Sequence, residues 1–216
     1  MNDSRNLVLQ LQAFLRPGNE KTIKIIGFRQ IAWCFALGRS LRELEPTQHL
    51  DDYLDKKEID QLQLYRNKPL AILQLTVKDL ADLKQKEQLD VFSLMQINTT
   101  IVNLTNAMGM AERIKSTVFP ATYRLFLHGF IYLFVITLSI SLSDISGYFE
   151  IPLLIVISSA FFLLERTATH LQDPFSNKTT DTAMTAIAKN IEINIKQLLD
   201  PSTQVTIEQP KDFYLL

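Results

Sequence analysis

The chain has 216 residues, 47% of them apolar, so it is long enough to bury a sizeable core in one or two domains. Its 22 basic and 23 acidic residues leave a net charge of −1, and this balance argues against a nucleic-acid-binding protein. A single cysteine, Cys34, excludes an intramolecular disulfide, and its neighbours Trp33 and Phe35 predict an inert core thiol.

Residues 1–116 carry apolar side chains at helical spacing and predict a cytosolic helical bundle. Pro17-Gly18 ends the first helix and Pro46 ends the second. Between the second and third helices, residues 46–57 are polar and acidic. They predict an exposed connection rather than a paired-carboxylate site, because no histidine lies at ligand spacing. The helices are expected at about residues 3–15, 20–45, 69–86 and 89–115.

The spacing of the apolar residues also predicts which side of each helix faces the core. The fourth helix is expected to be long and amphipathic and to lead directly into the segment that follows. The expected core residues are Leu7, Leu11 and Leu15 in the first helix, Ile23, Ile26, Trp33, Leu37, Leu41 and Leu44 in the second, and Leu70, Leu73, Val77 and Leu80 in the third. Along the fourth helix lie Phe92, Met95, Thr99, Val102, Asn106 and Met108 to Met110.

Residues 117–172 predict a transmembrane hairpin with spans at about 125–143 and 148–166. From Leu125 to Leu142 there is no charged residue, and at a rise of about 1.5 Å per residue this run nearly matches the roughly 30 Å core of a bilayer. The alternative is a hairpin buried in a soluble helical core. Basic residues flank the hairpin and the intervening loop contains an acid, which predicts that both outer ends face the cytoplasm. These residues are Arg113, Lys115, Arg124 and Arg166 at the flanks and Asp144 in the loop.

Residues 173–200 predict a cytosolic loop followed by an amphipathic helix at about 182–199 that packs back on the bundle. Asp181 is expected to cap this helix. Residues 201–216 are expected to form an extended or disordered tail. The helix places its apolar residues on one stripe, at Met184, Ile187, Ile191, Ile195 and Leu198.

Catalytic and metal-binding patterns are not found in the sequence. His49, His128 and His170 are the only histidines, and none has the spacing of a metal site. No phosphate loop or nucleophile elbow is present, so we expect no enzyme, cofactor or metal. His128, four residues after Arg124 in the first span, is expected either to face a protein interior or aqueous path, or to lie at headgroup level.

Several motifs follow each other between residues 112 and 175, and their order and spacing resemble the bestrophin family, in particular its bacterial members. The resemblance covers roughly residues 4–200, beginning with Ser4-Arg5-Asn6-Leu7, and lacks the two spans that precede this point in the family. It implies no calcium clasp, because the loop before the last helix has only Asp181 as an acid. The motifs are Glu112-Arg113-Ile114, Pro120-x-x-Tyr123, Leu127-His128, Tyr132-Leu133-Phe134 and Leu171-x-Asp173-Pro174-Phe175.

The resemblance implies a homopentameric ion channel of the plasma membrane, anion-conducting by default, with the bundle and both termini in the cytoplasm. It also implies a narrow aperture at Phe119, between Val118 and Pro120, where a ring of apolar side chains excludes water. The alternative for Phe119 is a hydrophobic anchor at the membrane edge. The alternative function is a non-conducting, membrane-anchored helical interaction module, either a shortened family member or a fragment.

Overall fold

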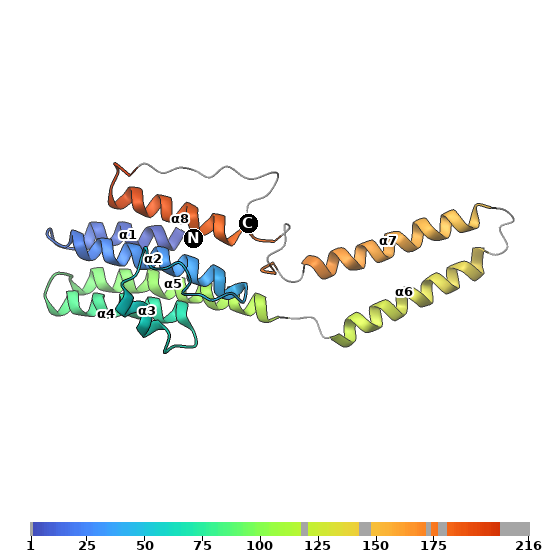
Figure 1. Cartoon of the computed structure of the whole chain (residues 1–216), viewed down its shortest axis with the longest axis horizontal. Coiled ribbons are helices and arrows are strands. Elements are labelled where there is room, and N and C mark those ends of the chain that lie inside the picture. Colours follow the sequence, from blue (N-terminus) through green and yellow to red (C-terminus); the bar gives the residue numbers. More distant parts are fainter. Residues whose placement is uncertain (1, 118–120, 143–147, 172–173, 177–180, 204–216) are drawn as a thin grey trace. The chain divides into compact units, whose positions relative to one another are not determined.

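The computed structural model describes residues 2–117, 121–142, 148–171, 174–176 and 181–203, and every regular element in these ranges is an α-helix (Figure 1). The chain divides into two units, one formed by Met1–Arg113 with Phe175–Leu216 and the other by Ile114–Pro174. The expected all-α fold is therefore confirmed. The helices are α1 (Asn2–Phe14), α2 (Glu20–Leu41), α3 (Lys56–Leu62), α4 (Lys68–Gln85), α5 (Val91–Ser116), α6 (Ala121–Leu142), α7 (Glu150–Leu171) and α8 (Met184–Leu199).

Helix α2 is the centre of the first unit. It packs against α1, α4 and α8, and Figure 1 shows it between α8 and α4. A helix covered on several sides must be apolar around much of its circumference. The middle of α2 meets this condition, since its buried residues include Ile26, Ile31, Ala32, Trp33, Cys34, Ala36 and Leu37.

Two glycines let α8 lie close to α2. Gly27 and Gly38 are about three helical turns apart, so they lie on the same face of α2. A Cβ atom at Gly27 would lie 2.9 Å from Leu199 Cδ1, and one at Gly38 would lie 3.3 Å from Met184 Cβ. Glycine inside a helix costs about 0.5–1 kcal/mol relative to alanine. The close packing of α8 accounts for its use at these two positions.

The Arg29 cluster, formed by Arg29, Glu58 and Asp79, joins three helices. Arg29 is only 8% exposed on α2. It donates two hydrogen bonds to Glu58 Oε1 on α3, from Nε at 2.8 Å and from Nη2 at 2.5 Å, and its Nη1 binds Asp79 on α4. Glu58 also accepts a hydrogen bond from the backbone N–H of Asp55 at 3.2 Å, which stabilises the first turn of α3.

The elements differ from the expectation at three places. Helix α3 was not expected, because seven residues are too few to show a helical period. Helix α2 ends at Leu41 rather than near residue 45, and the chain turns through Glu43 with φ 59°. The expected Asp181 cap is wrong, since Ala183 occupies the N-cap of α8 and no side chain bonds there.

The expected core residues are correct in α1 and α8. Some of those expected in or near α2, α4 and α5 are exposed instead. Leu44, Leu70 and Val77 are exposed, although the other expected residues of α4 are buried. On α5, Phe92 is 84% exposed, and Met95 and Val102 are exposed as well. The side of α5 that is buried carries Ile97, Thr100, Ile101 and Leu104 instead, together with Met108, which was expected.

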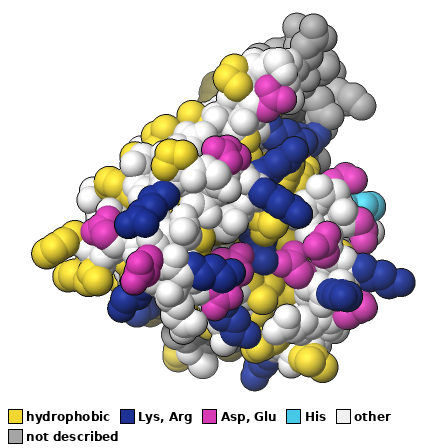
Figure 2. Space-filling view, turned by 90° about the vertical axis from the view of Figure 1, so that its left-hand side faces the viewer, with side chains coloured by type: hydrophobic (Ala, Val, Ile, Leu, Met, Phe, Trp, Pro, Cys, Tyr) yellow, Lys and Arg dark blue, Asp and Glu magenta, His cyan; other side chains and the backbone are white. Residues whose placement is uncertain are grey.

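Charged side chains of both signs share the surface of the bundle. Figure 2 shows Lys and Arg side chains interspersed with Asp and Glu on the face that it presents. Such a mixed face produces no strong field of one sign. This agrees with the net charge of −1.

Cys34 is expected to be unreactive in the folded protein. Its side chain is buried, its Sγ lies 3.7 Å from Ser4 Oγ, and burial raises the pKa of the thiol to about 11 against the smaller, opposing effect of the Ser4 hydrogen bond. Only about one thiol in a thousand would be ionised at pH 8, and the thiolate is the reactive form. Labelling with dithionitrobenzoate should therefore be far slower in the native protein than in guanidinium. Equal rates would contradict this assignment.

The Arg29 cluster should stabilise the bundle strongly. Arg29→Met leaves two partly buried carboxylates without their cation, and we expect it to lower the free energy of unfolding by about 3 kcal/mol. The control is Lys68→Met, which removes the more exposed Lys68–Glu45 pair at 2.5 Å and should cost less than about 1 kcal/mol. Denaturant titration in detergent measures both. Equal losses would show that the cluster has no special role.

Candidate functional site in the apolar hairpin

Helices α6 and α7 form the second unit and pack along each other. Their contact includes two aromatic pairs, Tyr132 with Phe162 at a ring distance of 5.7 Å and Phe134 with Phe161 at 4.7 Å. Such tilted and edge-on pairs add to the stability that burial provides. The two helices therefore form a hairpin with its own aromatic contacts.

Both helices are long and apolar enough to cross a bilayer, over Thr122–Leu142 and Ile151–Ala168. In a soluble protein, a core helix of this composition would be mostly buried. Here only 11% of the first segment and none of the second is buried within the chain. The exposed apolar side chains argue against the alternative of a soluble helical core.

His128 and Glu165 connect α6 and α7 by a polar contact. His128 Nε2 lies 3.6 Å from Glu165 Oε2, and the Glu165 side chain is 10% exposed. His128 is six residues from the start of the first segment, or about 9 Å along the helix. The His128 side chain therefore lies toward the end of the hairpin at which α6 begins and α7 ends, and it faces α7.

His128 also bonds to the backbone of its own helix. Its Nδ1 lies 2.9 Å from the carbonyl oxygen of Arg124. A carbonyl oxygen only accepts, so Nδ1 donates this hydrogen bond. The imidazole is thus held by α6 on one side and faces Glu165 of α7 on the other. Polar partners lower the cost of placing such ionisable side chains in an apolar hairpin.

The sequence analysis missed Glu165, although a signal was available. In a hairpin centred near residues 146–147, position 128 lies opposite position 165. The acid at that position was overlooked because the charge argument considered only the basic residues at the flanks of the hairpin and Asp144 in its loop. Tyr132 and Phe162 follow the same antiparallel pairing.

The predicted aperture residues Val118, Phe119 and Pro120 lie outside the described residues, as does Asp173. The aperture therefore stays a prediction. Arg124 and Tyr123 are described, and both are exposed near the start of α6. In the part of the chain that the structure describes, there is no group of three or more His, Cys, Asp or Glu residues placed to hold a metal ion.

Three of the motif residues, Glu112, Arg113 and Phe175, lie in the first unit. Glu112 on α5 accepts a hydrogen bond from Asn67 Nδ2 at 3.0 Å. Asn67 Oδ1 in turn accepts the backbone N–H of Leu70 at 3.1 Å and caps α4. Phe175 is buried in the core of the bundle, and Pro174 is half-buried. Glu112 and Phe175 thus act in packing and positioning, while Arg113 lies beside Glu112 on α5.

The sequence matches the family model described as bacterial/fungal bestrophin protein over residues 1–197. The voltage-dependent anion channel-forming protein YneE of Salmonella typhi is 29% identical over 197 residues, and that of Escherichia coli strain K12 is 27% identical over the same length. Each match covers 91% of this chain and 64% of the relative, so the chain spans less than two thirds of their length. A bacterial bestrophin homologue from Klebsiella pneumoniae is similar in structure, with a TM-score of 0.85 and 25% identity over 91% of this chain and 73% of that chain.

The contact between His128 and Glu165 should be measurable as a coupling energy. In a double-mutant cycle with His128→Gln and Glu165→Gln, we expect about 1 kcal/mol of coupling in the free energy of unfolding in detergent, because the two polar side chains are in contact across α6 and α7. The control is a cycle of His128→Gln with Arg166→Gln, which should be additive within about 0.5 kcal/mol. Additivity in both cycles would mean that the pair does not stabilise the hairpin.

Proposed function

The chain belongs to the bacterial and fungal bestrophin family, and from this membership we propose that it is a subunit of an anion-conducting membrane channel. The observation that carries the proposal is the hairpin of α6 and α7, whose apolar side chains are exposed within the chain. Lipid and neighbouring subunits are the surroundings that such side chains require. The names of the Salmonella and Escherichia relatives supply the anion.

One hairpin cannot enclose a pore, so conduction needs several copies of the chain. The family resemblance makes that number five. In a ring, each copy would contribute the same residues, and a narrow point would be lined by one side chain from each subunit. The proposed aperture is Phe119, with Val118 and Pro120 beside it. Apolar side chains there oppose hydrated ions, because they replace none of the water that an ion would lose.

The distribution of charge supports an orientation with the bundle in the cytoplasm. Arg113 lies before the first apolar segment, Arg124 lies near its start, and Arg166 lies near the end of the second. Basic residues at both outer ends of a hairpin favour placing those ends in the cytoplasm. Both termini would then lie on the same side as the bundle.

A membrane-anchored interaction module is the second candidate, because an apolar hairpin anchors a bundle whether or not ions pass. Ion flux separates the two. The purified chain would be reconstituted into liposomes loaded with a chloride-sensitive dye, and its mass in detergent would be measured by native mass spectrometry. A mass of five subunits with chloride flux is expected. A membrane-bound chain without flux would support the module, and a chain that stays soluble and monomeric without detergent would exclude both.

Phe119→Ala should widen the aperture and raise the single-channel conductance, because a smaller apolar ring excludes water less. Planar-bilayer recordings measure the conductance and the size of the largest permeant anion. Val118→Ala is the neighbouring control. If Val118→Ala changes both quantities while Phe119→Ala changes neither, the register is wrong by one residue. If neither substitution matters, the hairpin is an anchor.

A further inference from the structure

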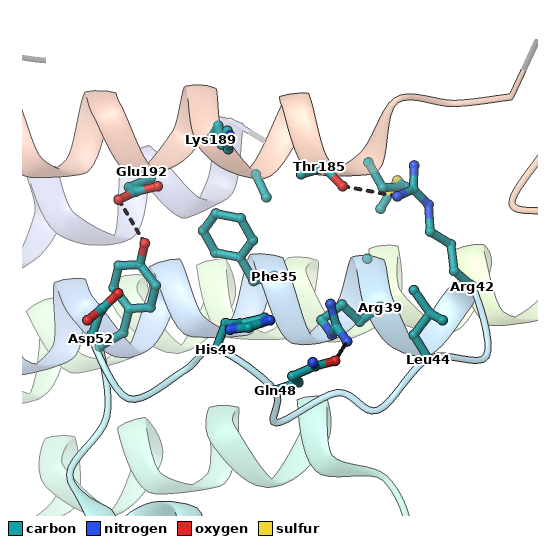
Figure 3. A pocket seen from close by; sticks show the side chains of 14 residues that line it. Phe35, Arg39, Arg42, Leu44, Gln48, His49, Asp52, Thr185, Lys189 and Glu192 are labelled. Carbon is teal, nitrogen blue, oxygen red and sulfur yellow. Dashed lines mark hydrogen bonds between the residues drawn. The ribbon is translucent and has the colours of Figure 1, made fainter. Parts of the chain in front are cut away.

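A pocket of about 290 Å³ lies between the C-terminal half of α2, the following loop and the N-terminal half of α8 (Figure 3). Its volume is close to the lower end of the range for small-molecule sites. All three walls belong to the first unit of the chain. No residue of the pocket belongs to the family motifs or to the polar pair of the hairpin.

One part of the pocket wall is apolar. Phe35 lies below α8 in Figure 3, and its ring stacks on Tyr53 with a centroid distance of 5.7 Å and an angle of 16°. Met184 and Ala188 contribute from α8, and Leu44 contributes from the loop. Leu44 is 44% exposed, so its side chain is accessible from solvent. This wall would accept the apolar body of a small ligand.

The other part of the wall carries two arginines, Arg39 and Arg42. Arg39 is held in place by a hydrogen bond from its Nε to the carbonyl oxygen of Glu45 at 2.7 Å and by Gln48. Arg42 Nη1 donates to Thr185 Oγ1 at 3.0 Å, while its Nε is buried and has no hydrogen-bond partner. A buried donor without a partner costs free energy, which an acceptor would recover.

Arg42 also lies beside the N-terminus of α8, where a cation is unfavourable. Thr185 is in the first turn of α8, where the helix dipole is positive. The guanidinium and the dipole therefore favour the same kind of partner, an anion. Burial lowers the pKa of Arg42, and the charge of Asp181 opposes this effect in part. Asp181 thus compensates only some of the positive charge at this place.

Two acidic residues, Asp52 and Glu192, line the pocket at the end opposite Arg42. Glu192 Oε1 accepts hydrogen bonds from Tyr53 Oη at 2.8 Å and from Lys196 Nζ at 2.6 Å. Its charge is balanced by Lys196, so it does little to repel an anion bound near Arg42. Figure 3 shows Glu192 and Arg42 at opposite ends of the pocket, with Phe35 between them.

We propose that this pocket binds a small amphipathic carboxylate, whose anionic end pairs with Arg42 and whose apolar body lies against Phe35 and Leu44. A carboxylate presents two oxygens that match the edge of a guanidinium, so a small rotation of Arg42 would give its Nε an acceptor. Because the ligand would contact both α2 and α8, binding would stabilise the docking of α8. The proposal needs no ion conduction, so it stands or fails independently of the channel.

The test uses 4-phenylbutyrate as the probe and the intact chain in a neutral detergent. Isothermal titration calorimetry measures its affinity, and thermal unfolding measures the stabilisation. The neutral analogue 4-phenylbutan-1-ol enters micelles without offering a carboxylate, so it controls for partition into detergent. We expect saturable binding of the carboxylate and a rise in Tm. The alcohol should bind at least about tenfold more weakly, because it lacks the charge-assisted hydrogen bonds.

Two variant pairs locate the site. Arg42→Gln should weaken binding about tenfold, while Arg66→Gln, an exposed arginine outside the pocket, should leave it unchanged. Leu44→Glu places a negative charge at an exposed position of the wall and should also weaken binding about tenfold, relative to the neutral Leu44→Gln. The Leu44 pair keeps the test valid if Arg42→Gln unfolds. The proposal is overturned if the wild type shows no saturable binding at millimolar probe, or if the folded variants bind as the wild type does.

Discussion

The packing of α2 is the constraint on which the bundle depends, because this helix contacts α1, α4 and α8. Three of its residues set contacts with α3, α4 and α8, and they do so by two different physical effects. Gly27 and Gly38 remove side chains where α8 approaches, and Arg29 places a buried cation between carboxylates of α3 and α4. The glycines add no attraction of their own but permit close contact, whereas Arg29 adds directional hydrogen bonds. A helix that lost either feature would still be apolar, but it would no longer specify where its neighbours lie.

The hairpin follows a different rule, because its apolar surface is not covered by its own chain. An ionisable group in such a segment needs a polar partner. His128 Nε2 and Glu165 Oε2 lie 3.6 Å apart across α6 and α7, and His128 Nδ1 donates to the Arg124 carbonyl oxygen. Aromatic pairs such as Tyr132 with Phe162 add ring packing between the helices. The hairpin is thus joined by polar contact and by ring packing, while most of the two apolar segments remains exposed within the chain.

The sequence predicted the helices well and their faces unevenly. In α1, Leu7 and Leu11 are buried as expected, because a short helix with few apolar residues has only one possible core face. In α5, apolar residues occur on both sides, so periodicity alone could not decide that Ile97 faces inward and Phe92 outward. The short helix α3 begins with a capping box of Asp55 and Glu58, but Glu58 also bonds to Arg29, a contact between distant parts of the chain that no local pattern contains. Glu165 could have been found from hairpin symmetry, whereas the unpartnered Nε of Arg42 depends on three-dimensional packing and could not.

The pocket and the close contact between α2 and α8 arise from the same geometry. Gly38 brings Met184 to the surface of α2 about one turn before α2 ends at Leu41. Beyond that point α2 no longer supplies a surface, and the chain turns back through Glu43 in the left-handed region. The first turn of α8 therefore lies beside this loop. Its N-cap residue is Ala183, which provides no side-chain hydrogen bond to the N–H groups of that turn. Arg42 fills this place with hydrogen bonds to Thr185 and to the carbonyl oxygen of Thr182, but these bonds do not neutralise its charge. Because α2 ends here, Arg42 places a cation beside the N-terminus of α8. An anion would interact favourably with both the guanidinium and the helix dipole.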